Sequence, residues 1–329
     1  MKPTVFIDGE AGTTGLEIHS RLINRKDIKL LSIEETKRKD PRERARRLNE
    51  VDLAILCLPD EAAREAVSLV ENPDVKLLDA SSAHRTSNGW VYGFPELARE
   101  QRQKIATAKR VSNPGCYPTG FIACIRPVVE SGIIPPTFPI TVNAVSGYSG
   151  GGKGLIEVYQ DAPSVDGEVA YPYGIYGLNF SHKHVEEMRS YSGLTNPPLF
   201  VPAVGHFERG MLTQIPLPLW ALPGSPKGKD IHSVLTEYYH GEDYVVVMPF
   251  ADTKYLRDSK FLDPREANGT NIVQLFVFAN DNTKEALLVA RLDNLGKGAS
   301  SAAVQNMNIM LGLPEQDFVQ SSSQVVSLQ

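Results

Sequence analysis

Residues 4–15 read TVFIDGEAGTTG, and this stretch decides the fold of the N-terminal half. An apolar run from Thr4 to Ile7 is typical of a strand, and an apolar helical pattern follows from Leu16 to Leu22. Strand, glycine turn and helix in this order open a dinucleotide-binding βαβ unit. The glycines of such a turn allow tight bending and let the backbone approach a pyrophosphate closely. We predict a cofactor-binding turn that contains Gly9, Gly12, Thr13, Thr14 and Gly15.

The same alternation of strand and helix continues along the first third of the chain. Residues 28–33, 52–58 and 75–79 read as further strands, and residues 61–70 read as a helix. Strands that alternate with helices favour a parallel, doubly wound sheet of the Rossmann type.

The residues after the second strand bear on the choice of cofactor. An acidic residue there binds the ribose hydroxyl of NAD, whereas basic residues hold the 2′-phosphate of NADP. The chain offers Ser32 and Glu34, and then the basic residues Lys37, Arg38, Lys39 and Arg42. We predict NADP, with Ser32 and Arg38 on the phosphate. The alternative is that residues 37–47 form only a solvated charged helix or loop.

The second half has a different pattern. Long β-type runs at 140–145, 212–216, 244–248 and 272–279 suit a mixed or antiparallel sheet in an α+β domain, and residues 297–311 read as a helix. We expect an NADP-binding domain at 1–115, completed by a C-terminal helix at 297–329, and a catalytic and oligomerisation domain at 116–296. The tail from 320 to 329 is expected to be peripheral.

Cys116 is the candidate nucleophile. It follows the turn-forming Asn113-Pro114-Gly115 and precedes an apolar helical stretch, which places it at a helix N-terminus. There the helix dipole and free N–H groups stabilise a thiolate, the reactive form of cysteine. The alternative for any cysteine is a buried core position.

Thiol chemistry near neutral pH needs a proton donor and acceptor, and the candidates in the second half are His182, His184 and His206. No Cys or further His stands near them at zinc spacing, so no metal is expected.

Three other stretches carry polar groups suited to anions or amides. The glycine-rich run 146–154 suits a phosphate or a developing oxyanion, although its spacing is not that of a P-loop, and it is alternatively only a flexible loop. Arg85 follows a strand end, where open sheets bind ligands. The stretch 293–306 contains amides suited to a nicotinamide carboxamide. The predicted contacts are Ser146, Gly147, Asn294 and Gln305 for the cofactor, and Arg85, Lys153 and Arg209 for substrate anions.

Composition excludes several classes of function. The 329 residues are 42% hydrophobic and 22% charged, with a net charge of −5, which argues against a nucleic acid or an anionic membrane as partner. Three cysteines in a chain of this length suggest no disulfide framework and fit a reducing cytosol. No signal peptide or membrane span is evident, and we expect a cytoplasmic protein.

Taken together, these stretches resemble the N-acetyl-γ-glutamyl-phosphate reductase family, in its shorter second form, within the aspartate-semialdehyde dehydrogenase superfamily. The resemblance runs nearly end to end. The most specific match is NPGCYPT at 113–119, joined by the glycine turn, the segments 79–85 and 92–97, and 146–150 with 293–306. HKHVEE at 182–187 is similar to the His-x-His-x-Pro-Glu motif of the family, with Glu186 in place of proline.

The resemblance implies an NADPH-dependent oxidoreductase of arginine biosynthesis. Cys116 would form a thioester during reductive dephosphorylation of N-acetyl-L-glutamyl 5-phosphate. It favours His184 as the general base, with His182 and His206 open, and it implies a homodimer or homotetramer. The alternatives are reduction of aspartyl or aminoadipyl phosphate, or a cofactor-binding regulator without catalysis.

Overall fold

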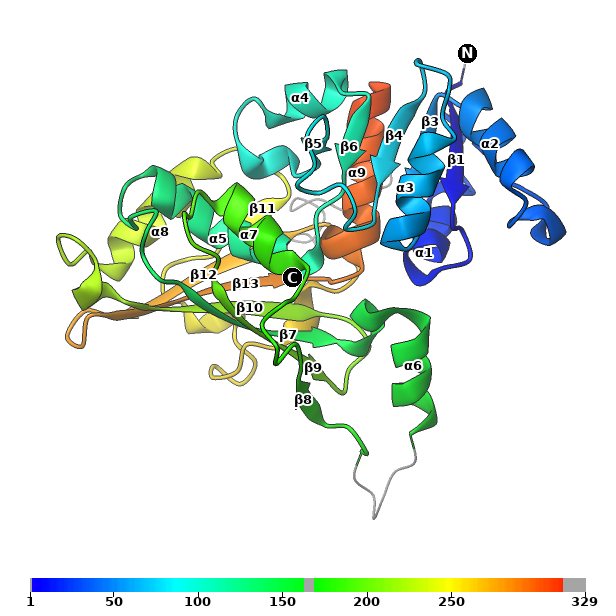
Figure 1. Cartoon of the computed structure of the whole chain (residues 1–329). Helices are drawn as coiled ribbons and strands as arrows, with labels where there is room; N and C mark the ends of the chain where they lie inside the picture. Colours follow the sequence, from blue (N-terminus) through cyan, green and yellow to red (C-terminus); the bar gives the residue numbers. More distant parts are fainter. Residues whose placement is uncertain (1, 163–168, 316–329) are drawn as a thin grey trace. The chain divides into compact units, whose positions relative to one another are not determined.

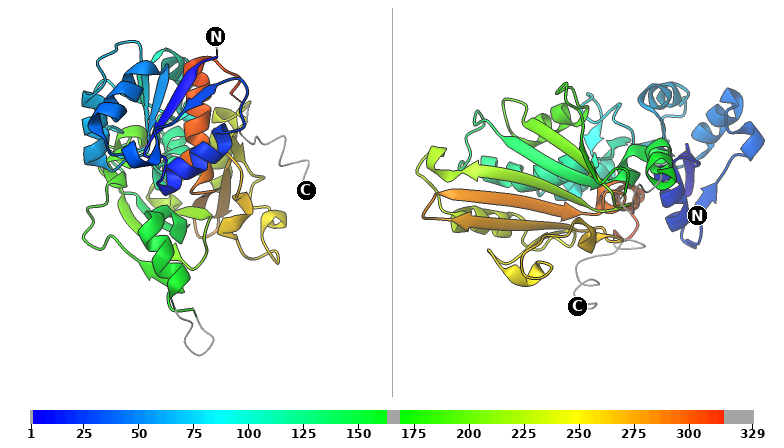
Figure 2. Two further views of the ribbon diagram at one scale, coloured as in Figure 1. Left: turned by 90° about the vertical axis from the view of Figure 1, so that its right-hand side faces the viewer. Right: turned by 90° about the horizontal axis from the view of Figure 1, so that it is seen from below.

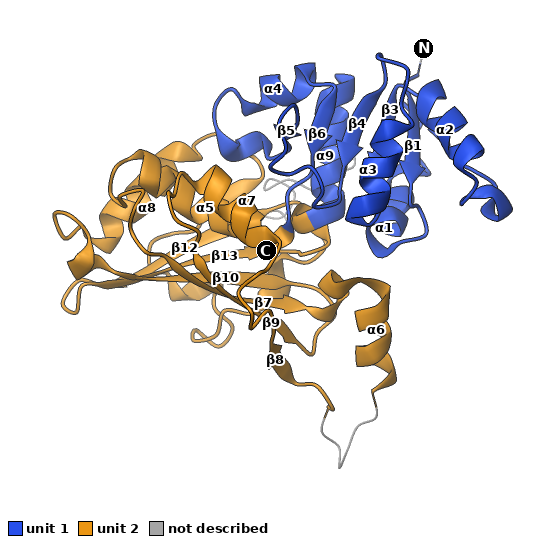
Figure 3. Cartoon of the chain, viewed as in Figure 1, with its two compact units in different colours: residues 1–115, 299–319 blue, residues 116–298, 320–329 orange. Residues whose placement is uncertain are grey.

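The chain divides into two compact units (Figure 3). The computed structural model describes residues 2–162 and 169–315. Unit 1 comprises Met1–Gly115 and Ala299–Val319, and unit 2 is built on Cys116–Gly298. No helix within the described residues is both long and apolar enough to cross a membrane. The predicted peripheral tail at 320–329 lies outside the described residues.

Unit 1 contains a parallel sheet, as the alternating pattern predicted. Its strand order is β2-β1-β3-β4-β6-β5, and every neighbouring pair is parallel. The strands are β1 (Thr4–Asp8), β2 (Lys29–Leu31), β3 (Leu53–Leu56), β4 (Lys76–Asp79), β5 (Val91–Tyr92) and β6 (Arg110–Ser112). The doubly wound sheet expected from the sequence is thereby confirmed.

Helices cover both faces of this sheet (Figures 1 and 2). They are α1 (Thr13–Leu22), α2 (Pro41–Glu50), α3 (Asp60–Ser68), α4 (Gln101–Thr107) and α9 (Ser301–Leu311). α9 contacts α1, α4 and β4, while α2 contacts α3 and β1. α9 is buried along most of its length, so the end of the chain supplies a central part of the core of this unit. The helix expected from residue 297 is preceded by a π-helical turn, Gly296–Ser300.

The basic run after β2 includes a true helix. Pro41 occupies the first turn of α2, and the Asp40 side chain accepts a hydrogen bond from the Arg42 backbone N–H at 2.9 Å. Both features are strong helix-start signals. Leu48 packs into the core beside Phe6, so one side of this charged helix is structural.

Unit 2 contains the predicted mixed sheet, with strand order β11-β12-β13-β10-β7-β9-β8. The β7–β9 and β11–β12 pairs are parallel, and the other neighbouring pairs are antiparallel. The strands are β7 (Thr141–Gly147), β8 (Tyr173–Ile175), β9 (Leu199–Gly205), β10 (Met211–Pro218), β11 (Val245–Val247), β12 (Val273–Asn280) and β13 (Glu285–Leu292). The sequence did not predict β8, β9 or β13.

The helices of unit 2 are α5 (Cys116–Glu130), α6 (Gly152–Asp161), α7 (His184–Ser192) and α8 (Gly228–Tyr238). α5 contacts β10, β12 and β13 as well as α7 and α8, so it lies at the centre of one layer of the unit (Figure 1). An apolar cluster that includes Leu212 and Phe276 packs with Tyr255 and Leu262. Cys116 is the first residue of α5 and so lies at the N-terminal end of this central helix.

Candidate active site

Cys116 is the first residue of α5, as its sequence context predicted. Its side chain is partly exposed, whereas Cys124, further along the same helix, is fully buried. Burial also raises the pKa of the thiols of Cys57 and Cys124 far above the usual range. Because thiolates are the nucleophilic form, Cys116 is the thiol placed for chemistry.

The π-helical turn packs tightly against Cys116. A Cβ atom added at Gly298 would lie 2.6 Å from the Cys116 Cβ, which is too close for a real side chain. The Asp293 carbonyl accepts hydrogen bonds from the N–H groups of Gly296 and Gly298, at 3.1 and 3.0 Å. The absence of a side chain at Gly298 therefore leaves the room that the nucleophile occupies.

Two of the predicted histidines pack around Tyr117, the residue that follows Cys116. The ring centroid of Tyr117 lies 5.9 Å from His184 and 6.3 Å from His182. Its hydroxyl donates to the Ala203 carbonyl at 3.1 Å and accepts from the Tyr176 hydroxyl at 3.3 Å. Burial raises the pKa of Tyr117 well above its ordinary value and that of Tyr176 to about 12, so both phenols stay protonated at neutral pH.

The two histidines lie next to each other. The His182 Nδ1 atom accepts a hydrogen bond from the His184 backbone N–H at 3.2 Å, which places the ring proton of neutral His182 on Nε2. Burial lowers the pKa of His182 below its ordinary value of 6.5. His184 is the first residue of α7 and is 7% exposed, and its ring centroid lies 4.7 Å from that of His182.

His206 belongs to a different cluster. Its ring packs with Tyr148 and Tyr159, at centroid distances of 6.2 and 5.5 Å, and its Nδ1 lies 3.3 Å from the Tyr171 carbonyl oxygen. The structure thus groups His182 and His184 around Tyr117 and places His206 with other aromatic residues.

Asn113 holds the segment that leads to Cys116. It is 1% exposed, and both its backbone and its side chain are hydrogen bonded. Its N–H donates to the Asp79 carbonyl at 2.7 Å, and its carbonyl accepts from Arg85 Nε at 2.9 Å. Its side-chain amide donates to the Ala299 carbonyl at 3.0 Å and accepts from Asn306 Nδ2 at 3.0 Å. This loop is rigidly anchored within unit 1.

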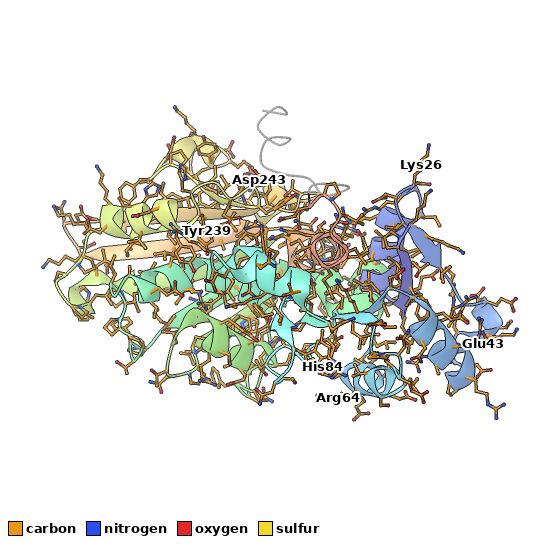
Figure 4. The ribbon with its side chains drawn as sticks, turned by 90° about the horizontal axis from the view of Figure 1, so that it is seen from above. Lys26, Glu43, Arg64, His84, Tyr239 and Asp243 are labelled. Atoms are coloured by element: carbon orange, nitrogen blue, oxygen red, sulfur yellow. The ribbon has the colours of Figure 1, made fainter. Side chains whose placement is uncertain are left out.

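Arg85 lies on the loop after β4, and buried side chains of that loop bind the Asp79 carboxylate. His84, labelled in Figure 4, donates from Nδ1 to the Asp79 carboxylate at 2.6 Å and stacks on Trp90 at 4.2 Å. Ser81 also donates to Asp79, from its backbone N–H and its hydroxyl. Arg85 therefore stands on a loop that has little freedom to move.

The glycine turn is too tightly packed for side chains at two of its three glycines. Gly9 has φ +90°, and a side chain there would collide with the Cys57 carbonyl. A side chain at Gly15 would collide with the Gly9 carbonyl, so α1 packs directly on the turn. At Gly12, by contrast, an added Cβ would make only ordinary contacts of 3.5 Å or more. The fold therefore needs glycine at positions 9 and 15, whereas at position 12 it would accept a methyl group.

A cavity of about 290 Å³ adjoins this turn in unit 1. Arg38 lines it, whereas Ser32 is exposed and is not among the lining residues. The Glu34 side chain is 74% exposed and pairs with Lys37 at 3.3 Å. The cavity is lined by Phe6, Ile7, Asp8, Gly9, Glu10, Ala11, Ile33, Arg38, Lys39, Arg44, Leu58 and Ala62. The lining combines apolar side chains with three basic and two acidic ones, and the apolar and basic groups suit the adenosine half of NADP.

Some of the predicted contact residues have structural partners. Asn294 accepts from the Gly210 N–H at 2.8 Å and donates to the Ser149 hydroxyl at 3.0 Å, and so ties two loops together beside Ser146 and Gly147 at the end of β7. Gln305 donates to Glu96 and Glu315, at 2.8 and 2.7 Å.

The two remaining substrate candidates both lie in unit 2. Lys153 is in the first turn of α6, with a side chain that is 83% exposed and 3.7 Å from Glu157. Arg209 lies 3.8 Å from Glu208.

Sequence reasoning did not single out Tyr176, Gly298 or Glu10 as site residues. Tyr176 and Gly298 carry no local signal, because their roles depend on long-range packing against Tyr117 and Cys116. Glu10 lies inside the glycine turn, where its proximity to Arg38 follows only from the fold.

Two protein families match the chain. "Semialdehyde dehydrogenase, NAD binding domain" matches residues 4–105, and "Semialdehyde dehydrogenase, dimerisation domain" matches residues 116–294. Among solved structures, aspartate semialdehyde dehydrogenase II from Vibrio cholerae has a TM-score of 0.69 at 15% identity and covers 95% of this chain and 99% of its own. The NADP complex of the Candida albicans enzyme has a TM-score of 0.62 at 13% identity and covers 94% and 99%. These likenesses establish the fold.

Much closer relatives settle the family. N-acetyl-gamma-glutamyl-phosphate reductase 2 of Nostoc sp. is 66% identical over 321 residues, which is 96% of this chain and 98% of the relative. The reductase of Trichormus variabilis is 67% identical, and the match covers 96% of this chain and 98% of the relative. The reductase of Burkholderia lata is 50% identical, and the match covers 94% of this chain and 97% of the relative. The resemblance inferred from the motifs is confirmed. The chain therefore belongs to the N-acetyl-γ-glutamyl-phosphate reductase family.

Proposed function

We propose that the protein reduces N-acetyl-L-glutamyl 5-phosphate to N-acetyl-L-glutamate 5-semialdehyde, reversibly and with NADPH, as a step of arginine biosynthesis. The observation that carries this proposal is Cys116 at the first position of α5, followed by a tyrosine that packs with two histidines, in a chain that is 66% identical to a reductase with this name. Reduction of aspartyl or aminoadipyl phosphate is the alternative, and the experiment below tests the aspartyl substrate.

Cys116 performs the covalent step. Its thiolate attacks the 5-carbonyl carbon, so that a C–S bond forms while the C–O bond to phosphate breaks and phosphate leaves. The chemistry that NADPH supplies when bound is hydride donation to the resulting thioester carbon. The oxyanion formed by that reduction collapses, the C–S bond breaks, and the aldehyde is released with the thiolate restored. N–H groups at the start of α5 are suited to hold the oxyanion.

His184 is our candidate for the general base and acid. It lies beside Tyr117 and is largely buried, and its backbone N–H is tied to His182. His182 then acts as a neutral positioning residue, because its Nδ1 is occupied by that hydrogen bond. The location of His206 in the Tyr148–Tyr159 cluster argues for a structural role.

Anion contacts come from Arg85 and Arg209, with Lys153 as a more exposed third candidate. Arg85 is the strongest of these, because Asn113, three residues before Cys116, accepts a hydrogen bond from its Nε. A planar guanidinium on a rigid loop suits a phosphate or a carboxylate. For the cofactor, the glycine turn takes the pyrophosphate and Arg38 takes the 2′-phosphate. Ser146, Gly147 and Asn294 shape a second loop on unit 2.

The test is phosphate-dependent reduction of NADP⁺ with N-acetylglutamate 5-semialdehyde, beside aspartate semialdehyde and with NAD⁺ as a control. Strong turnover with the first aldehyde and NADP⁺, abolished in Cys116→Ser, supports the proposal. Turnover with aspartate semialdehyde alone would keep the mechanism and overturn the substrate. Undiminished turnover in Cys116→Ser would overturn the mechanism.

An oligomer is expected, because the family that matches residues 116–294 is described as a dimerisation domain. Exposed apolar side chains gather on the edge strand β8 and beside it, and they are Val169, Tyr171, Tyr173, Ile175, Leu178, Phe180 and Leu199. We infer that a second copy of the chain docks here to give a homodimer, and a homotetramer requires a further interface.

Sedimentation of a Leu178→Glu/Phe180→Glu variant tests this surface. The control is Trp220→Glu, which changes another exposed apolar residue of unit 2. A monomer in the first variant alone supports the inference, and an unchanged oligomer in both would contradict it. The cytoplasmic location stays a prediction.

A further inference from the structure

The cavity beside the glycine turn contains acidic residues as well as basic ones. Asp8 and Glu10 line it together with Arg38, Lys39 and Arg44. The adenosine 2′-phosphate of NADP adds about two negative charges at neutral pH. An acidic lining residue therefore has to be neutralised by a partner, or it works against this phosphate.

Asp8 is neutralised. Arg44 Nη2 lies 2.9 Å from Asp8 Oδ2, and Arg44 Nε lies 3.3 Å from Asp8 Oδ1, so the pair has a two-pronged geometry. Both residues are less than a tenth exposed. This buried ion pair is part of the wall, and it leaves Arg38 and Lys39 as the cations available to a phosphate.

Glu10 forms an ion pair with one of these cations, Arg38. Its Oε1 atom lies 3.4 Å from Arg38 Nη2 and 3.8 Å from His19 Nε2. The Glu10 side chain is 16% exposed and the Arg38 side chain 37%, so Arg38 faces solvent while Glu10 lies below it in the turn. A carboxylate in this position holds the same guanidinium that a phosphate would bind.

We propose that Glu10 is an internal competitor of the NADP 2′-phosphate for Arg38, and that it limits the preference of the enzyme for NADP(H) over NAD(H). This inference rests on the proposed use of NADPH at this turn. When the phosphate binds, Arg38 exchanges the weak, partly exposed carboxylate contact for a doubly charged one. Glu10 thereby limits NADPH affinity, which favours release of the cofactor after turnover.

The test is binding alone, measured by fluorescence titration of NADPH and NADH without substrate. Exposed ion pairs are weak, so Glu10→Gln should tighten NADPH binding only about three- to fivefold, with NADH binding unchanged. Glu34→Gln is the matched control, because it removes the same charge from an acid that is 74% exposed and paired with Lys37. NADPH binding by this control should stay within about twofold of the parent.

Each other outcome overturns the proposal in a recognisable way. Weaker NADPH binding alone in Glu10→Gln would mean that Glu10 orients Arg38. Weaker binding of both cofactors would mean that it holds a ribose hydroxyl. Equal tightening of both would place its effect at the pyrophosphate, and no change would mean that it does not compete.

An Arg38→Gln background separates this inference from the proposed cofactor site. Arg38→Gln should weaken NADPH binding and spare NADH, and a second change, Glu10→Gln, should then have no effect. Persistent tightening in that background would contradict competition for Arg38. Undiminished NADPH binding in Arg38→Gln, or no binding of either cofactor by the parent, would instead count against the proposed cofactor site.

Discussion

Asn306 of α9 donates a hydrogen bond from Nδ2 to Oδ1 of Asn113 at 3.0 Å, and this contact joins the end of the chain to the loop that carries the nucleophile. The same Nδ2 donates to the Gly93 carbonyl at 2.7 Å, and Asn306 is fully buried. The contact explains why residues after 298 belong to unit 1, because the loop before Cys116 depends on them for its hydrogen bonds.

Asn306→Ala should therefore destabilise the protein and impair catalysis. It leaves two acceptors without this donor, which we expect to cost about 2–4 kcal/mol in the free energy of unfolding. Asn282→Ala, at an exposed position of the β12–β13 hairpin, is the control and should change it by less than about 0.5 kcal/mol. Urea unfolding gives the free energy of unfolding of each variant. Equal stability of the two variants would contradict this account of the loop.

The glycine turn yields a paired prediction. Gly12→Ala should fold normally, because its added methyl group meets only ordinary contacts, but it should bind NADPH and NADH more weakly because the methyl group fills the space for the pyrophosphate. Gly9→Ala should lose about 1–3 kcal/mol or more of stability, since φ is +90° and the Cys57 carbonyl blocks the side chain. Thermal unfolding and cofactor titration distinguish the two effects. Normal cofactor binding in a folded Gly12→Ala protein would remove the turn from the cofactor site.

Gly298→Ala should damage the nucleophile directly. The new methyl group would lie 2.6 Å from the Cys116 Cβ, so either the π-helical turn or Cys116 has to move. We expect a loss of kcat of about tenfold or more, in line with the large effect of small displacements of reacting groups. The rate of iodoacetamide alkylation at Cys116 should change in parallel. Parent-like turnover and alkylation would show that the turn yields without disturbing the thiol.

His182 predicts a pH dependence of stability. Burial lowers its pKa in the folded protein below the ordinary 6.5, so below that pH the unfolded chain binds the proton more readily. The contribution of neutral His182 is complete above about pH 6.5 and is lost as the pH falls through the lower folded-state value. Stability should thus decline less steeply between about pH 6.5 and 5 in His182→Gln than in the parent. The free energy of unfolding is measured by chemical denaturation at several pH values. If it falls equally with pH in His182→Gln and in the parent, His182 is not the titrating group.

Local patterns predicted the features that depend on neighbouring residues. Two such features are the strand–turn–helix at 4–22 and the helix beginning at Cys116. They were predictable because glycines, prolines and the spacing of apolar residues act over a few residues. The charged run after β2 remained ambiguous between helix and loop. Its helix start is local, at Asp40 and Pro41, but Leu48 is what docks it on the core.

Features set by distant pairing were not predictable. β13 reads EALLVARL, a composition that favours a helix, yet it lies between β10 and β12 as a strand because the sheet supplies partners on both sides. β9 contains Pro202, a residue that argues against a strand in the sequence. Within the sheet, however, the Pro202 carbonyl still accepts a hydrogen bond from the Tyr176 backbone N–H. The separation of His206 from the His182–His184 pair likewise follows only from the tertiary packing around Tyr117.

The central claim is that Cys116 carries the acyl group, and mass spectrometry of the enzyme tests it most directly. The protein is mixed with N-acetylglutamate 5-semialdehyde and NADP⁺ without phosphate, quenched in acid and digested. We expect an N-acetylglutamyl adduct on the peptide that contains Cys116, discharged when phosphate is added before the quench and absent in Cys116→Ser. Steady turnover with the adduct on another residue, or with no adduct on a quench that preserves thioesters, would contradict the account.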